Sequence, residues 1–209
     1  MGRRFLRFIS RAMRVVATNY ANIVRSHYYS HGNIRLFVFP RTFNELIQHN
    51  KIFKRDDLIT KTSDKWRVRQ YVKEKIGDRY LVPLWAVVEN PQSIDFDSLP
   101  NSFVVKANHG SGFNIFVTEK KRVERAKVDE TLAIWLKADF AAHQGEWAYR
   151  NIKRRILVEE MLVQDGEIPN DYKFFVFNGR VRMIQLSQGR QTASYRKNLY
   201  DEQWRQLAV

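Results

Sequence analysis

Residues 103–117 read FVVKANHGSGFNIFV, and two apolar runs in this stretch flank a short loop with one histidine and two glycines. The runs are typical of two antiparallel strands. In the loop, Asn108-His109-Gly110-Ser111-Gly112, the glycines let backbone N–H groups come close to a ligand, and such amides bind anionic oxygen. Lys106 adds a positive charge two residues earlier. The hairpin therefore has the composition of a phosphate site, although an ordinary hairpin turn can have the same pattern.

The composition indicates a globular protein of one domain, or of one domain with an appendage. The 209 residues are 44% hydrophobic and 13% aromatic, and they include no cysteine. Disulfides, thiolate metal sites and cysteine nucleophiles are therefore excluded. The sequence has no run of about 18 uncharged apolar residues, so we expect no membrane-spanning helix. We expect a cytoplasmic protein.

The positive charge is concentrated near the N-terminus. The formal net charge is +14, and residues 1–55 contain eleven Lys and Arg but one acid, Glu45. In residues 1–29 apolar side chains recur at helical spacing with arginines largely between them, a pattern typical of a basic amphipathic helix. This arm, residues 1–39, could bind an anionic membrane surface and so place the protein at the inner face of the membrane. Alternatively, it could pack on the domain with its arginines in solvent.

The rest of the chain predicts an α+β protein with antiparallel strands. Residues 62–77 are expected to form a helix that is capped by Thr62 or Ser63 and ends at Gly77. Residues 171–187 form the clearest hairpin, because Asn178-Gly179 tolerates the positive φ angles of a tight turn. The other expected elements are strands at residues 80–88 and 154–162 and a helix at residues 123–140.

Further cations support an anion site. Lys65 lies in the first turn of the expected helix, where free amides usually favour an acid; it could also be a solvated surface lysine. Strand alternation places Lys173 on the opposite face from Tyr172, among aromatic residues. A lysine among aromatic side chains indicates a functional role. Alternatively, its side chain only extends to solvent at the edge of the sheet. Paired acids end the strand at residues 154–162 and could meet ribose hydroxyls or simply lie in solvent.

Seven segments between residues 40 and 204 follow one another in a characteristic order. They are PRTFNELI, DKWRVRQYV, LVPLWAVV, SFVVKANHGSGFNI, KRRILVEEML, DYKFFVFNGRVRMIQL and RKNLYDEQW. Together they resemble the TupA-like branch of the ATP-grasp superfamily, which is named for teichuronopeptide biosynthesis and found among cell-surface polysaccharide genes. The resemblance implies a two-lobed α+β fold whose lobes hold ATP between them. The resemblance divides the chain into three parts. They are the arm, a segment of helices and a linker strand before the core at residues 40–100, and the ATP-grasp core at residues 101–209.

The implied activity is the ATP-dependent formation of an amide bond. A carboxylate is phosphorylated, an amine attacks the acyl phosphate, and ADP and phosphate are released. The substrates implied are carboxylates and amines of glycans or peptides.

The resemblance also implies residue roles. Two lysines and the glycine loop are implied to bind the phosphates of ATP, and these residues are Lys65, Lys106, Gly110, Ser111 and Gly112. A hinge segment and an acid after it are implied to bind the nucleoside. These residues are Glu159, Glu160, Met161, Leu162 and either Asp165 or Glu167. The residues implied to act at the transferred phosphoryl group are Lys173, Arg196 and Asn198.

The resemblance further implies Mg²⁺. Family members continue past the YDEQW motif into a segment with acidic and asparagine ligands for this ion, whereas this chain ends at Val209. We identify no metal ligands and expect an ATP-grasp core that lacks its last metal-binding segment. Because Mg²⁺ neutralises charge on the phosphates, we expect either a truncated ligase with poor turnover or a degenerate member that binds ATP without catalysis.

A binding module without catalysis belongs to a different functional class. Aromatic residues interleaved with cations suit single-stranded nucleic acid, but the basic excess lies outside the aromatic-rich body, so nucleic acid is the least favoured partner. Lys120 lies in a charged turn after the hairpin and is expected to stand apart from the phosphate site.

Overall fold

The computed structural model describes residues 20–21, 23–25, 27–30, 32, 39–189 and 192–208. The chain divides into two compact units, Met1–Glu160 and Met161–Val209. The first combines helices with an antiparallel sheet and the second contains a further antiparallel sheet, which confirms the α+β class. The boundary falls inside residues 101–209, the segment that the sequence treats as one core, and each unit is described by itself.

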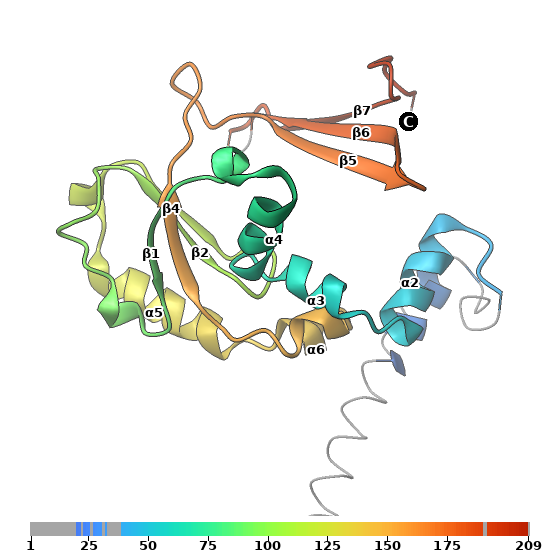
Figure 1. The fold of residues 1–209 in the computed structure, drawn as a ribbon, viewed down its shortest axis with the longest axis horizontal. Helices are drawn as coiled ribbons and strands as arrows, with labels where there is room; N and C mark the ends of the chain where they lie inside the picture. The colour runs from blue at the N-terminus through green and yellow to red at the C-terminus, as the bar shows by residue number, and fades with distance from the viewer. Residues whose placement is uncertain are drawn as a thin grey trace, which may run out of the picture. The chain divides into compact units, whose positions relative to one another are not determined.

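The sheet of the first unit has four antiparallel strands in the order β1-β4-β2-β3 (Figure 1). Their bounds are Leu84–Val88 for β1, Phe103–Ala107 for β2, Asn114–Val117 for β3 and Ile156–Glu160 for β4. The two central strands, β2 and β4, are the most deeply buried, as their nearly continuous apolar sequences predict. The expected hairpin is therefore confirmed as β2 and β3. Pro83 directly precedes the edge strand β1, a position where proline costs no ladder hydrogen bond.

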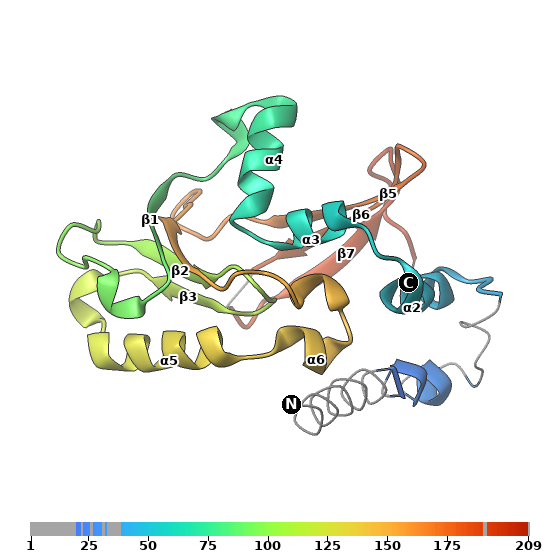
Figure 2. The ribbon, with the colours of Figure 1, turned by 60° about the horizontal axis from the view of Figure 1, so that its bottom comes forward.

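The core lies on one face of this sheet, under α5 (Arg125–Lys137). Val128 and Leu132 of the helix belong to the same buried cluster as Phe103 and Val105 of β2. Figure 2 shows α5 along this face and α4 beyond the opposite one. Because side chains alternate along a strand, Lys106 of β2 points to the face opposite α5.

The helix expected at residues 62–77 corresponds to α4 (Arg67–Ile76), which begins later than predicted, and residues 62 and 63 belong to a separate helix before it, α3 (Asp57–Ser63). Thr62 and Ser63 end α3, so the prediction that one of them caps the helix was wrong. Instead, Asp56 caps α3, and Asp64 ends it. The Asp64 side chain accepts a hydrogen bond from the Trp66 amide at 2.8 Å, which supports the turn between the helices. The predicted stop at Gly77 is confirmed, with a φ of 89°.

The N-terminal part of the first unit is also helical. In α2 (Phe43–Phe53), Thr42 and Glu45 form a reciprocal capping box that the sequence analysis missed. Of the expected basic arm, the described part includes helical residues between 20 and 30. There Ile23 and Tyr20 pack with Ile52 of α2, which favours packing on the domain for this part. Residues 1–19 lie outside the described residues.

The remaining elements of the first unit are short. They are η2 (Asp78–Tyr80), η3 (Pro91–Ser93), η4 (Lys120–Arg122), α6 (Phe140–Gln144) and η5 (Trp147–Tyr149).

The second unit is a three-stranded antiparallel sheet in the order β5-β6-β7. Its strands are β5 (Asp171–Phe177), β6 (Arg180–Gln188) and β7 (Arg196–Tyr200). Asn178 and Gly179 have φ angles of 49° and 76°, which confirms the tight turn between β5 and β6. A bulge between Phe175 and Val176 shifts the register near this turn.

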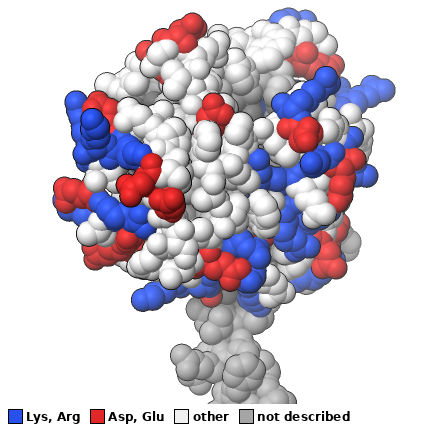
Figure 3. Space-filling model, turned by 60° about the vertical axis from the view of Figure 1, so that its left-hand side comes forward, with Lys and Arg blue, Asp and Glu red and all other residues white. Residues whose placement is uncertain are grey.

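The surface charge outside the N-terminal region is mixed. Figure 3 shows lysines and arginines interspersed with acidic residues on the face that it presents. This agrees with residues 56–209, which hold 25 Lys and Arg against 21 Asp and Glu. In the described part of the chain, no helix has the length and apolarity needed to cross a membrane.

Candidate functional site

A buried carboxylate and two cations lie on the sheet face opposite α5. Lys106 of β2 reaches Glu159 of β4 with an Nζ–Oε2 distance of 2.5 Å, and Arg69 of α4 lies 3.5 Å from the other oxygen. The Glu159 side chain is 8% exposed. Glu159 pairs directly with Val104 in the sheet, so Lys106 is its diagonal neighbour on the same face. The cluster carries more positive than negative charge.

Lys65 joins this cluster from the segment between α3 and α4. Its Nζ donates to the carbonyl oxygens of Ala107, at 3.1 Å, and Gly110. Its backbone amide donates to the Asn108 carbonyl at 3.1 Å. Burial, followed by repulsion from Lys106, lowers the pKa of Lys65 below its ordinary value. The two lysines predicted to bind phosphate are thus brought together at the β2–β3 loop, although Lys65 precedes α4 rather than lying in its first turn.

Asn108 anchors the loop from inside the protein. It is fully buried, and its side-chain amide donates to Asp64 Oδ1 at 2.8 Å and to the Lys153 carbonyl at 2.9 Å. Its side-chain oxygen accepts from the Arg155 amide at 2.7 Å. From the sequence alone, Asn108 is expected to be part of a loop open to a ligand. Nothing in the local sequence indicates this anchor, because its partners lie more than 40 residues away.

His109 is a second buried anchor. Its Nε2 lies 2.9 Å from the Trp135 carbonyl oxygen, and its ring is near that of Phe113. Burial is the main cause that lowers the pKa of His109 below its ordinary value. The ring is therefore neutral at neutral pH and contributes to packing rather than charge.

The glycine loop beyond these anchors has two different parts. Gly110 is buried, and a Cβ atom there would lie 2.9 Å from ring carbons of Phe113 and Phe140, so only glycine fits. Ser111 and Gly112 are exposed, and Gly112 has a φ of 81°. Among the described residues, the amides of Ser111 and Gly112 have no hydrogen-bond acceptor. These exposed donors can receive an anionic ligand.

The predicted hinge coincides with the boundary between the units. The Glu160 amide donates to the Pro83 carbonyl at 3.0 Å, and the second unit begins at Met161. Leu162 is 48% exposed, and its amide has no acceptor in the described part of the chain. In the second unit, Glu167 pairs with Gln164 across a turn that contains Asp165.

The three residues predicted to act at a transferred phosphoryl group do not share one face of the β5-β6-β7 sheet. Lys173 pairs with Gln185, whereas Asn198 pairs with the next residue along β6, Leu186. Because side chains alternate along a strand, Lys173 and Asn198 point to opposite faces. Arg196 shares the face of Asn198 and donates to Gln188 Oε1 at 3.1 Å. The sequence analysis did not predict β7 and so could not detect this separation.

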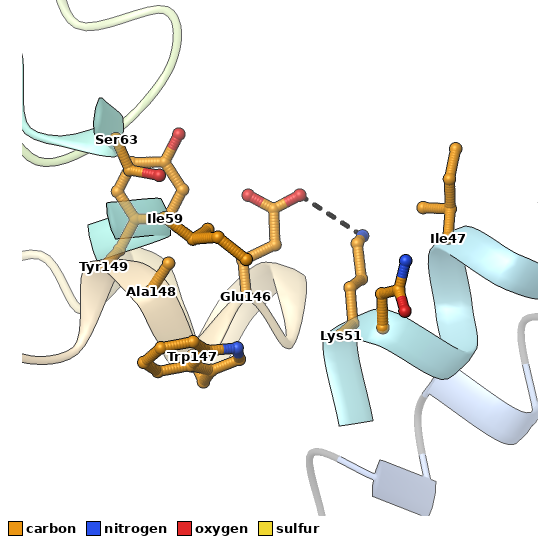
Figure 4. Close-up of a pocket in the computed structure, with 9 residues that line it drawn as sticks. Ile47, Lys51, Ile59, Ser63, Glu146, Trp147, Ala148 and Tyr149 are labelled. Carbon is orange, nitrogen blue, oxygen red and sulfur yellow. Dashed lines mark ion pairs between the residues drawn. The ribbon is translucent and has the colours of Figure 1, made fainter. Parts of the chain in front are cut away.

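The first unit also has a largely apolar cavity of about 290 Å³ between α2, α3 and η5. Figure 4 shows the Lys51–Glu146 ion pair, with an N–O distance of 3.2 Å, beside Ile59 and the Trp147 ring. Burial raises the pKa of Tyr149, which also lines the cavity. None of the residues predicted to bind nucleotide lines it.

The described residues form no ready-made cluster of metal ligands. Among them, no group of three or more histidines and acids is arranged to hold a metal ion. Glu159, the carboxylate nearest the glycine loop lysines, is already paired with two cations.

A family model described as TupA-like ATPgrasp matches residues 45–209, which include every predicted site residue and parts of both units. No curated protein and no solved structure matches the chain significantly.

Proposed function

The chain belongs to the TupA-like ATP-grasp family, and from this premise we propose that it is an ATP-dependent ligase that joins a carboxylate to an amine. The observation that carries the proposal is the β2–β3 loop, where Lys65, Lys106 and the free amides of Ser111 and Gly112 lie together. ATP-grasp proteins in general bind ATP and use Mg²⁺.

The phosphates of ATP are proposed to bind at this loop. A polyphosphate needs both positive charge and close backbone donors, and the loop offers both. Lys106 is held by Glu159 at the sheet surface, so its ammonium is fixed in place rather than free to rotate in solvent. Arg69 offsets part of the Glu159 charge, which leaves Lys106 available to an anion.

The nucleoside is proposed to bind at the hinge. The free amide of Leu162 and the neighbouring backbone of Glu160 and Met161 can form hydrogen bonds to the edge of adenine. A carboxylate shortly after the hinge, Glu167 or Asp165, is proposed to accept hydrogen bonds from the ribose hydroxyls.

The reaction is proposed to proceed through an acyl phosphate. A substrate carboxylate oxygen attacks the γ-phosphorus and ADP leaves; an amine then attacks the acyl carbon and phosphate leaves. Cations offset the repulsion between the carboxylate and the phosphoryl group. For this role the family resemblance proposes Arg196 and Asn198, which share a sheet face, and Lys173, which points to the opposite face.

The substrates are proposed to be glycan or peptide carboxylates and amines of cell-surface polysaccharide or teichuronopeptide biosynthesis. This part of the proposal rests on the family resemblance. The basic N-terminal region is proposed to bind anionic lipids at the inner face of the membrane.

The test is ADP release by the purified chain with ATP, Mg²⁺, and a panel of uronate and glutamate carboxylates with amine acceptors. Even at a low rate of turnover, the proposed ligase should release ADP in a manner that depends on both substrates. With an ¹⁸O-labelled carboxylate, one label should appear in the released phosphate, because the carboxylate oxygen bridges to phosphorus in the intermediate. Label-free phosphate would exclude the acyl phosphate, and ATP binding without turnover on any substrate would favour a nucleotide-binding protein.

A further inference from the structure

We propose that Lys65 is a positioning residue, which orients the exposed amide of Ser111 toward the nucleotide phosphates by holding the carbonyl groups on the inner side of the loop. This inference rests on the proposed phosphate site and assigns to Lys65 an action through the loop in place of direct contact with a phosphate.

The first support is the way in which Lys65 uses its donors. An ammonium group has three N–H donors, and two of them in Lys65 are directed at the carbonyls of Ala107 and Gly110. The backbone amide of Lys65 binds a third carbonyl, that of Asn108. Lys65 thus holds three carbonyl groups within four residues of the loop, whereas the contact made by Lys106 is to Glu159.

The second support is the geometry of the peptide group. In a trans peptide, the C=O of one residue and the N–H of the next point in opposite directions. The peptide group between Ala107 and Asn108 shows this geometry, because both of its polar atoms have a partner. The Ala107 carbonyl accepts from Lys65, and the Asn108 amide points away from Lys65 and donates to the Arg155 carbonyl at 3.0 Å.

The same rule applies at Gly110. Its carbonyl is held by Lys65, so the Ser111 amide points away from Lys65. Ser111 is exposed, and its amide has no acceptor among the described residues. The contact with Lys65 therefore fixes the direction of a free donor at the loop surface.

The third support is that the base of this arrangement is rigid. Asp64, directly before Lys65, is fully buried and binds both the Asn108 side chain and the Trp66 amide. The segment that carries Lys65 and the start of the loop are therefore held together independently of Lys65 Nζ. At the tip of the loop, Gly110 depends on Lys65 Nζ for its carbonyl contact, whereas the Gly112 carbonyl accepts from the Asn114 amide at 3.0 Å.

The first experiment measures loop order in the nucleotide-free chain. Lys65→Met keeps a long side chain without donors, and it should increase the hydrogen-exchange rate of the Ser111 and Gly112 amides and lower their ¹⁵N heteronuclear NOE. Lys106→Met removes a charge from the same site but no loop contact, so it should leave these signals unchanged. Lys65→Gln keeps a neutral NH₂ donor group and should restore part of the order. Unchanged Ser111 and Gly112 signals in Lys65→Met would overturn the proposal.

The second experiment is a double-mutant cycle on ATP affinity. Ser111→Pro removes the amide hydrogen that Lys65 is proposed to orient. In the parent chain, Lys65→Met should weaken ATP binding about tenfold, as expected for one lost hydrogen bond to a charged group. In the Ser111→Pro background it should weaken binding much less, while Lys106→Met should cost the same in both backgrounds. Equal losses from Lys65→Met in both backgrounds would show direct phosphate contact.

The two experiments separate this inference from the proposed function. If the parent chain does not bind ATP, the proposed function fails, yet the nucleotide-free loop measurements still decide whether Lys65 orients the loop. Melting temperatures of each variant identify any loss that comes from unfolding.

Discussion

Asn108 shows how much of the site depends on single buried polar residues. Its side chain connects the loop to Asp64 and to the chain that enters β4 through Lys153 and Arg155. Buried polar groups cost free energy when they lack a partner, so such residues stabilise a fold mainly through the groups that they satisfy. Asp64 is itself fully buried.

Asn108→Ala should therefore lower the free energy of unfolding by about 2–3 kcal/mol, because the partly buried Lys153 carbonyl and Arg155 amide and the buried Asp64 Oδ1 each lose a partner. Urea unfolding measures this loss. Asn101→Ala is the control, since Asn101 is exposed and contacts the Lys120 amide at the surface. Similar losses in both variants would contradict the role of Asn108 as an anchor.

His109 predicts a pH dependence of stability. Its folded-state pKa is lowered from the ordinary value of 6.5, chiefly by burial. Above pH 6.5 the ring is neutral in both states and its contribution to stability is fully present. As the pH falls below 6.5, the unfolded state binds the proton more readily, and the free energy of unfolding decreases. In urea titrations from pH 7.5 to 5, His109→Gln should show a smaller decrease than the parent chain; equal decreases would exclude His109 as the cause.

At the scale of elements, the sequence predicted those features that depend on local pattern. The β2–β3 hairpin, β4 and the Asn178-Gly179 turn follow from apolar runs and turn residues, and the structure has all three. The break between α3 and α4 could not be predicted in the same way. It depends on Asp64, which is held by Asn108, a residue 44 positions away.

The candidate site follows the same division. The glycine loop and Lys106 could be identified from their spacing, and the structure places Lys65 beside them. The ion pair of Lys106 with Glu159 could not be predicted from the sequence, because it depends on the register between β2 and β4. Lys120, which is expected to stand apart from the phosphate site, donates to the carbonyls of Phe96, Asp97 and Leu99. Substitution of Lys120 would therefore disturb a loop, and the exposed Lys121 is the better control.

The corrected helix boundaries can be tested with two threonines. Thr42→Ala should lower the free energy of unfolding by about 1 kcal/mol, because Thr42 caps α2 and accepts from the Glu45 amide. Thr62→Ala should change it by about 0.5 kcal/mol or less, since Thr62 lies near the end of α3, is exposed and bonds back to the Leu58 carbonyl. Thermal or urea unfolding compares the two. A larger loss from Thr62→Ala would restore it as a cap.

At the scale of the whole molecule, the family match at residues 45–209 extends over parts of both compact units. The described chain places the proposed phosphate site within the first unit and begins the second unit at the proposed adenine-binding hinge. Because a ligand that binds the folded state stabilises it by mass action, occupation of the phosphate site should be visible in the stability of the folded chain.

The central claim is that Lys106 and the β2–β3 loop bind the phosphates of ATP, and the most direct measurement is the rise in melting temperature that ATP produces. ATP should raise the melting temperature of the parent chain and adenosine should raise it less, because adenosine lacks the phosphates. Lys106→Met should remove most of the difference between ATP and adenosine, while the control Lys121→Met should keep it. Equal ATP shifts in the two variants, or no ATP shift in the parent chain, would contradict the account.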